Sequence, residues 1–252
     1  MKELRLCDNG FFEYVLNLSN KYKLGIEVQS FYDPYIIERE PSIIQNHVIG
    51  LSEFQFGKSL HAPFWELNIG SKMRGVSQTT IEMFNFAYDI ACTLGCTGVI
   101  VHNGYIPNTY EENGWINRAT ELWNDFLSDK KDNITFYIEN QFELSSNLLC
   151  RLIDEVNSSK LKICLDIGHV NAHSNHSIKS WIERMNKRIG YVHMHNNNGL
   201  VDEHLGINNG TIPTIEVAKI LEMYSPDAIW SIECNVDELE QSITFLKDNN
   251  II

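Results

Sequence analysis

The sequence predicts an α/β fold in which eight parallel strands close into a (β/α)8 barrel, and three observations support this prediction. Eight short apolar runs alternate with segments of helical periodicity along 252 residues, a common length for one such barrel. The runs are apolar almost without interruption, as expected for strands that are buried on both faces. Seven of the runs carry an acidic residue or a histidine within the last three residues, so a polar site is expected at the C-terminal face of the strands.

The predicted strands are short runs rich in β-branched, aliphatic and aromatic residues. In order they cover residues 4–7, 24–29, 58–62, 98–102, 134–139, 161–166, 189–193 and 228–233. Helices are predicted where apolar residues recur three or four positions apart. These segments are 11–22, 79–94, 116–127, 144–156, 177–186, 214–223 and 236–247, with a further short helix at 42–51 inside a less regular stretch.

We expect one domain spanning residues 1–252, because no linker, repeat or shift in composition divides the chain. A doubly wound open sheet is the structural alternative. That fold would favour a glycine-rich phosphate-binding turn after an early strand, and neither Gly10 nor the stretch from Gly70 to Gly75 has the required spacing.

Composition narrows the classes of function. The chain has 20 basic and 33 acidic residues, and its net charge of −13 argues against a broad basic face for nucleic acid or anionic lipid. A local basic groove stays open as an alternative. No apolar run approaches the roughly 18 residues of a membrane span, and the first residues lack a signal-peptide pattern. Six scattered cysteines in mostly apolar segments indicate reduced core thiols, so we expect a cytoplasmic protein without membrane partners.

The polar residues at the strand ends are the candidate site. In a parallel barrel these ends share one face, and a carboxylate or histidine buried there is costly unless it is paired or bound to a metal. The residues in question are Glu27, His61, His102, Glu139, Asp166, His193 and Glu233. Their oxygen and nitrogen donors favour a divalent metal ion, with Zn or Mn preferred and one to three ions per chain.

Further candidate ligands follow the strands. His169 stands three residues after Asp166 in a predicted strand-to-loop turn, and Asp202 and His204 form an Asp-x-His pair whose alternative is a solvated loop. His195 shares a strand side with His193 and either lines the site or supports a ligand. Glu27 is interpreted as a supporting or substrate-side carboxylate, with a buried ion pair as the alternative. His173 and His176 are expected at the surface.

Several motifs, taken in order, resemble the xylose isomerase-like and endonuclease IV-like superfamily of barrels. They are SLHAPFWELNIGS (59–71), VIVHNG (99–104), YIENQFE (137–143), KICLDIGH (162–169), YVHMHNNNGLVDEH (191–204) and SIEC (231–234). The resemblance runs from LGIEVQ to WSIECN and implies a barrel with metals at the C-terminal face of its strands.

The resemblance implies roles for individual residues. In the isomerase and epimerase branch, Glu139, Asp166, His193 and Glu233 would hold one metal, and Glu139 and Glu233 would be the catalytic acid–base pair. In the endonuclease IV-like branch, His61, His102 and Glu139 would hold one metal. The second metal would be held by the four residues named for the isomerase branch, Glu139, Asp166, His193 and Glu233. His169, Asp202 and His204 would hold the third. The arginine that epimerases carry after the His193 motif is replaced by NNNG, and the catalytic lysine of true xylose isomerases has no match.

Two functions therefore compete. The favoured one is a metal-dependent isomerase or epimerase of a small sugar or sugar phosphate, in which two glutamates move a proton. The alternative is an abasic-site endonuclease or phosphodiesterase with a trinuclear metal cluster, and only this alternative gives the chain a nucleic-acid partner. The compact acidic chain favours the first function, and the complete set of nine ligands favours the second. Self-association into a homo-oligomer is left open.

Overall fold

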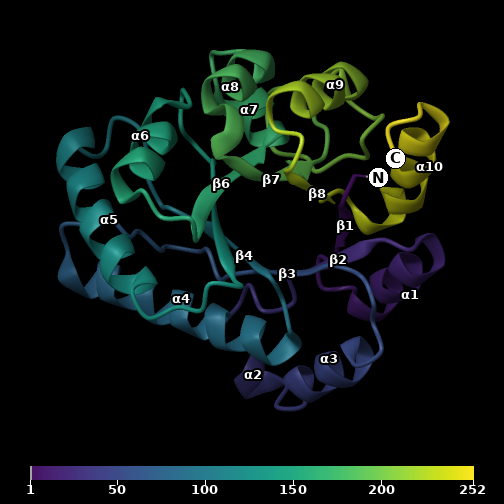
Figure 1. Ribbon diagram of the computed structural model, residues 1–252, viewed down its shortest axis with the longest axis horizontal. Coiled ribbons are helices and arrows are strands. Elements are labelled where there is room, and N and C mark those ends of the chain that lie inside the picture. Colours follow the sequence, from purple (N-terminus) through teal and green to yellow (C-terminus); the bar gives the residue numbers. More distant parts are fainter. Residues whose placement is uncertain (1) are drawn as a thin grey trace.

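Eight parallel strands form a closed barrel in the computed structural model, which describes residues 2–252 (Figure 1). The strands are β1 (Leu4–Cys7), β2 (Gly25–Val28), β3 (Lys58–His61), β4 (Gly98–His102), β5 (Thr135–Glu139), β6 (Leu161–Asp166), β7 (Ile189–Met194) and β8 (Ile229–Ile232). Each strand pairs with the next, and β1 pairs with β8 to close the barrel, with Leu4 opposite Trp230. The predicted fold class is confirmed, and the open-sheet alternative is excluded.

Helices surround the barrel, and most connect consecutive strands (Figure 1). They are α1 (Phe12–Tyr22), α2 (Ile36–Arg39), α3 (Ile43–Leu51), α4 (Arg74–Leu94), α5 (Glu112–Leu127), α6 (Asn147–Val156), α7 (Ile167–His173), α8 (Ile178–Met185), α9 (Thr214–Tyr224) and α10 (Leu239–Asp248). Two short 3-10 turns, η1 (Asn186–Arg188) and η2 (Val236–Glu238), precede β7 and α10. The single helix expected at 236–247 is thus a 3-10 turn followed by α10.

The sequence prediction missed α2 and α7. The four residues of α2 are too few to show a helical period. The strand-to-loop turn expected at His169 is wrong, because α7 begins directly after β6. The Asp166 side chain accepts a hydrogen bond from the backbone N–H of His169 at 2.7 Å and so caps this helix.

The core divides into two parts. One large apolar cluster packs the outer strand faces against the helices, while a small cluster of Ile100, Tyr137, Cys164 and Tyr191 fills the barrel interior. All six cysteines are free and five of them are buried, as expected for core thiols. Across residues 2–252 we find no helix with the length and apolar content needed to cross a bilayer.

Strand register brings polar side chains to one level. His102 on β4 is opposite Glu139 on β5, and Asp166 on β6 is opposite His193 on β7. The second pairing depends on an irregularity, because Ile163 pairs with Ile189 whereas Cys164 pairs with Tyr191. This β-bulge skips one residue of β7. Without it Asp166 would face Val192, whose side chain points to the other face of the strand.

Candidate metal centre

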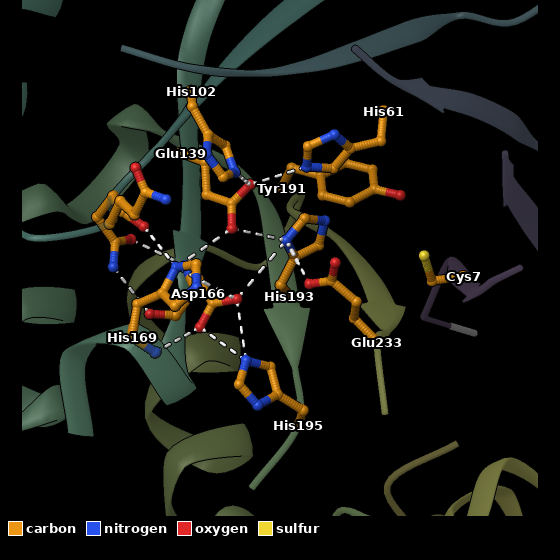
Figure 2. A network of polar contacts seen from close by, with 12 residues as sticks. Cys7, His61, His102, Glu139, Asp166, His169, Tyr191, His193, His195 and Glu233 are labelled. Carbon is orange, nitrogen blue, oxygen red and sulfur yellow. Dashed lines mark hydrogen bonds and ion pairs between the residues drawn. The ribbon is translucent and has the colours of Figure 1, made fainter. Parts of the chain in front are cut away.

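Four buried side chains at the ends of β5 to β8 meet around the imidazole of His193 (Figure 2). The Nδ1 atom of His193 lies 3.1 Å from Glu139 Oε1, 2.9 Å from Glu233 Oε2 and 3.7 Å from Asp166 Oδ2. Each of the four residues is at most 4% exposed. We call Glu139, Asp166, His193 and Glu233 the inner set.

Glu139 also faces two further imidazoles through its other oxygen. Its Oε2 lies 3.2 Å from His61 Nε2 and 3.0 Å from His102 Nε2. His61 ends β3 and His102 ends β4, so both rings approach from strands adjacent in the barrel. The set of His61, His102 and Glu139 therefore shares one carboxylate with the inner set.

A third set lies closer to the solvent. Asp202 Oδ2 is 3.1 Å from His169 Nε2 and 2.9 Å from His204 Nε2. Asp202 and His204 belong to the loop between β7 and α9, which a bridge between Asn196 and Leu205 holds in place. The side chains of Asp202 and His204 are 24% and 30% exposed, so this pair is partly buried rather than fully solvated. The structure thus brings together the nine predicted residues in the three predicted groups, each with potential ligand atoms within 4.8 Å of one another.

Four of the histidines have one ring nitrogen fixed and the other directed at a shared carboxylate. The fixed nitrogen donates to a carbonyl or carboxylate oxygen, which leaves the lone pair of a neutral ring on the nitrogen that faces the centre. The contacts are His61 Nδ1 to Ala62 O (2.8 Å), His169 Nδ1 to Asn140 O (2.8 Å), His204 Nδ1 to Glu233 O (2.7 Å) and His193 Nε2 to Glu27 Oε1 (3.0 Å). A lone pair facing a carboxylate at about 3 Å is repulsive unless a proton or a metal ion lies between them.

The donor set fits divalent metal ions. Carboxylates and imidazoles alone make up the three groups, which is the chemistry that Zn and Mn share. Within the described chain, the buried atom Asp202 Oδ1 has no hydrogen-bond donor, so it retains acceptor capacity for a cation. Glu139, shared by two groups, is placed to contact two ions at once.

The pKa shifts of the buried side chains also favour a cation at this site. Burial alone would lower the pKa of His169 and His204, but neighbouring carboxylates outweigh it. Asp166 and Asp202 raise the pKa of His169 well above its usual value, and Asp202 raises that of His204 to about 10. Burial would raise the pKa of Glu139, yet His193 and His102 hold it well below its usual value. Protons on the imidazoles therefore balance the carboxylates, and a bound cation would replace them.

Glu27 and His195 lie behind the ligand candidates. Glu27 is fully buried on β2 and accepts hydrogen bonds from His193 Nε2 at 3.0 Å and from Tyr191 Oη at 2.7 Å. It lies on the side of His193 that faces away from Glu139, so the structure gives no support to a substrate-side position. His195 Nε2 lies 3.1 Å from both oxygens of Asp166. A Cβ on Gly168 would lie 1.9 Å from this ring, which explains the glycine at that position.

His173 and Cys164 lie beside the candidate ligands. His173 is half-buried at the end of α7 and stacks near the ring of His169, with centroids 6.2 Å apart, while His176 is exposed as expected. Cys164 lies within reach of Glu139 and His193, and sequence analysis placed it only in the core. Burial raises the pKa of its thiol well above the usual value, which disfavours the thiolate form.

A cavity of about 650 Å³ opens above the three groups, and its volume is typical of a small-molecule site. Within the inner set, Glu139 and Glu233 line it, whereas Asp166 and His193 do not. Four amide side chains, Asn9, Gln29, Gln141 and Asn235, line it as well. Sequence analysis missed them, because amides in loops follow no periodic pattern. No lysine or arginine of the described chain is among its lining residues.

The sequence matches one family model and a protein of an archaeon. A family model described as a xylose isomerase-like TIM barrel matches residues 34–249. The protein is 32% identical over 215 residues to "Uncharacterized protein MJ1311" of Methanocaldococcus jannaschii, covering 75% of this chain and 68% of that one.

Solved structures give the same result for the fold. The protein TTHB071 of Thermus thermophilus, from a crystal soaked in ZnCl2, superposes with a TM-score of 0.78 at 22% identity and covers 98% of this chain and 97% of its own. A D-tagatose 3-epimerase-like protein superposes with the same TM-score at 25% identity and covers 99% and 97%.

Proposed function

The chain belongs to the xylose isomerase-like TIM barrel family, and from this premise we propose that it is a divalent-metal-dependent isomerase or epimerase of a small sugar or sugar phosphate. One observation carries the proposal. Of the four residues of the inner set, the two glutamates are those that reach the cavity. Glu139 and Glu233 both lie within 3.1 Å of the same atom, His193 Nδ1, and approach it from β5 and from the residue after β8. The relative described as D-tagatose 3-epimerase-like supports this class of substrate.

The proposed chemistry is proton transfer by these two carboxylates. One glutamate removes a proton from the carbon next to the sugar carbonyl, and the other returns a proton to the substrate. Gln29 Nε2 donates to Glu233 Oε1 at 2.8 Å and so fixes the orientation of that carboxylate. The amides that line the cavity can donate to and accept from sugar hydroxyls. A metal held by the inner set would supply positive charge to neighbouring substrate oxygens and acidify the proton that is removed.

Hydrogen exchange tests the proposal directly. The metal-loaded protein is incubated in D2O with a panel of ketoses and ketose phosphates, and deuterium on substrate carbon is measured by mass spectrometry. We expect exchange into at least one substrate, lowered about 10²-fold or more by Glu233→Gln. Glu203→Gln is the matched control, because Glu203 lines the cavity outside all three groups. Absence of exchange across the panel would contradict the proposal.

A second function is favoured by one specific observation. The inner set alone suffices for the isomerase, yet five further residues, His61, His102, His169, Asp202 and His204, complete two more groups. Three clustered cations suit a phosphodiesterase that acts on abasic DNA, because several positive charges can hold a phosphate. The carboxylate-rich cavity lacks a lysine or arginine in its described lining, which weighs against a polyanionic substrate. Cleavage of a duplex with one abasic site, by protein with three ions per chain, would establish this second function.

A further inference from the structure

A chain of hydrogen bonds leads from the inner set into the barrel interior. His193 Nε2 lies 3.0 Å from Glu27 Oε1, and Tyr191 Oη donates to Glu27 Oε2 at 2.7 Å. Ser59 Oγ continues the chain at 2.8 Å from Tyr191 Oη. These four side chains are fully buried, and Glu27 belongs to none of the candidate metal groups of the described chain. Its carboxylate therefore contacts a candidate ligand without being one.

The protons in this chain of hydrogen bonds have one consistent order. Tyr191 gives its single hydroxyl proton to Glu27, so its oxygen is left to accept from Ser59. A carboxylate has no proton to donate, so its contact with His193 requires a proton on Nε2. A neutral imidazole that binds a metal carries one proton, which leaves the lone pair on Nδ1, the nitrogen that faces the carboxylates of the inner set. Glu27 thus selects the tautomer that can bind an ion there.

His193 differs from the other candidate ligands in the charge of the group behind it. One ring nitrogen of each of His61, His169 and His204 lies against a neutral backbone carbonyl, and His102 Nδ1 has no hydrogen-bond partner in the described chain. Among these histidines of the described chain, His193 alone contacts a carboxylate from outside the three groups. A charged acceptor makes the hydrogen bond roughly twice as strong and makes the imidazole a better electron donor to a metal.

The local charge also favours the inner set. It contains three carboxylates, whereas each of the other two groups contains one. Glu27 adds a further negative charge directly behind His193. The Cζ atom of Arg5 lies 5.7 Å from the ring centroid of Tyr191, but this guanidinium is paired with Glu3 at 2.6 Å rather than with Glu27. A divalent ion therefore meets its largest compensating charge at the inner set.

We propose that Glu27 is a positioning residue that makes the inner set the first of the three groups to bind a metal ion in the folded protein. It does so by keeping the His193 proton on Nε2 and by supplying a negative charge behind the ring. The inner set serves both the isomerase and the alternative phosphodiesterase, so this inference does not depend on which reaction occurs. Glu27 should therefore matter more for the first ion than Asp202 and His204, which are candidate ligands of the third set.

Competition with a chromophoric zinc chelator measures the affinity for the first ion. Glu27→Gln keeps the size of the side chain and removes its charge, and we expect it to weaken binding of the first Zn ion by about 10- to 100-fold. Ser59→Ala is the matched control, because Ser59 is equally buried on the same chain of hydrogen bonds and its replacement leaves the charge of Glu27 in place. This control and the combination of Asp202→Ala with His204→Ala should both bind the first ion as tightly as the unsubstituted protein.

A shorter acid separates the effect of charge from that of shape. Glu27→Asp keeps the charge but fills the buried space less well than Glu27→Gln does. It should bind the first ion more tightly than Glu27→Gln, because the charge behind His193 is retained. Circular dichroism of the metal-free variants verifies that each is folded. Tighter binding by Glu27→Gln than by Glu27→Asp would assign the effect to packing and overturn the proposal.

Nuclear magnetic resonance of the unsubstituted protein gives a test that needs no change at Glu27. Histidine rings are isotopically labelled at nitrogen, one equivalent of Zn is added, and the ring resonances are compared with those of the metal-free protein. The His193 resonances are assigned by their loss in His193→Gln. We expect the His193 ring to bind the ion first through Nδ1 and to keep its proton on Nε2.

The outcomes separate this inference from the proposed function. Unchanged affinity for the first ion in Glu27→Gln, or a larger loss in the Asp202 and His204 double variant, would overturn the role of Glu27. A first ion that changes the rings of His61 and His102, or a His193 ring with its proton on Nδ1, would overturn it as well. Ordered metal binding without deuterium exchange would support the role of Glu27 while removing the isomerase. Exchange together with unchanged affinity in Glu27→Gln would do the reverse.

Discussion

Glu139 faces four imidazoles through its two oxygens, more than any other carboxylate of the three groups; they belong to His61, His102, His169 and His193. Replacement by glutamine removes the negative charge but keeps the shape. We expect Glu139→Gln to lower metal content per chain and to reduce turnover by roughly 10²- to 10⁴-fold, because one proton-transfer group is lost. Metal analysis, activity and circular dichroism of one preparation check this. Normal metal content together with full activity would show that Glu139 is neither a ligand nor a catalytic residue.

Asp8 provides a pH prediction outside the three groups. Burial raises its pKa to about 6, although its carboxylate accepts hydrogen bonds from the backbone N–H groups of Gly10 and Gln29 and from Ser30 Oγ. The raised pKa means that the folded state binds this proton more tightly than the unfolded state. The resulting stability is present below about pH 4 and is lost as the pH rises through about 6.

Asp8→Asn removes this titration while retaining the hydrogen-bond geometry. We expect its stability relative to the unsubstituted protein to be about 2 kcal/mol more favourable at pH 7.5 than at pH 4.5. Urea unfolding at the two pH values measures the difference. A stability difference that is the same at both values would contradict the assignment.

At the scale of single residues, the convergence of the strand-end side chains was predictable because strand ends in a parallel barrel share one face, whereas their division into three groups was implied by the family resemblance. It could not find Gln29 or Gln141, because loop amides have no periodicity and their direction depends on the folded backbone. For the same reason the side of His193 on which Glu27 lies was open until the register of β2 and β7 was known.

Among the elements, the eight strands were predictable to within one or two residues, since uninterrupted apolar runs mark strands buried on both faces. The bulge between β6 and β7 was not predictable. Nothing in the composition of residues 161–166 or 189–193 specifies a skipped residue, yet the pairing of Asp166 with His193 depends on it. Helix α7 was missed because its N-cap, Asp166, was interpreted only as a metal ligand at the end of a strand.

Because Asp166 both caps α7 and is a candidate metal ligand, two substitutions of this residue can distinguish helix stability from metal binding. Asparagine caps helices as well as aspartate does, whereas alanine costs about 1 kcal/mol at this position. In chelator-treated protein, both substitutions remove the charge that faces the imidazoles, but Asp166→Asn keeps the cap and should therefore unfold at a higher temperature than Asp166→Ala. Both should bind less metal when ions are restored. Equal destabilisation by both substitutions would contradict the capping role.

The loop between β7 and α9 supplies Asp202 and His204, two of the three residues of the third set; the other is His169. Asp202→Ala combined with His204→Ala should remove about one metal ion per chain and leave the inner set intact. An epimerase that uses Glu139 and Glu233 should then lose little activity, while phosphodiester cleavage should fall by roughly 10²-fold or more. Elemental analysis, an epimerase assay and a phosphodiester-cleavage assay on the double variant distinguish the two functions. An unchanged metal count would show that this loop binds no ion.

At the scale of the whole molecule, the candidate ligands come from six consecutive strands or their ends, β3 to β8. Bound ions would link these strands in the folded state only, so metal binding adds to the free energy of unfolding. Removing metal with a chelator should lower the melting temperature by on the order of 10 °C, and Zn or Mn should restore it. A melting temperature unaffected by the chelator, with metal loss verified, would argue against tight binding.

The seam between β1 and β8 also sets an order of events during synthesis. A chain that leaves the ribosome N-terminus first exposes His61, His102 and Glu139 before the other candidate ligands, while Glu233 follows β8 and is the last of them to emerge. Leu4 cannot pair with Trp230 before then, so the nascent barrel stays open throughout translation of the first seven strands. If the chain binds metal during synthesis, the first complete group would be the two imidazoles and one carboxylate of His61, His102 and Glu139. The proposed proton transfer between Glu139 and Glu233 would require both carboxylates and so could begin only after Glu233 has been translated.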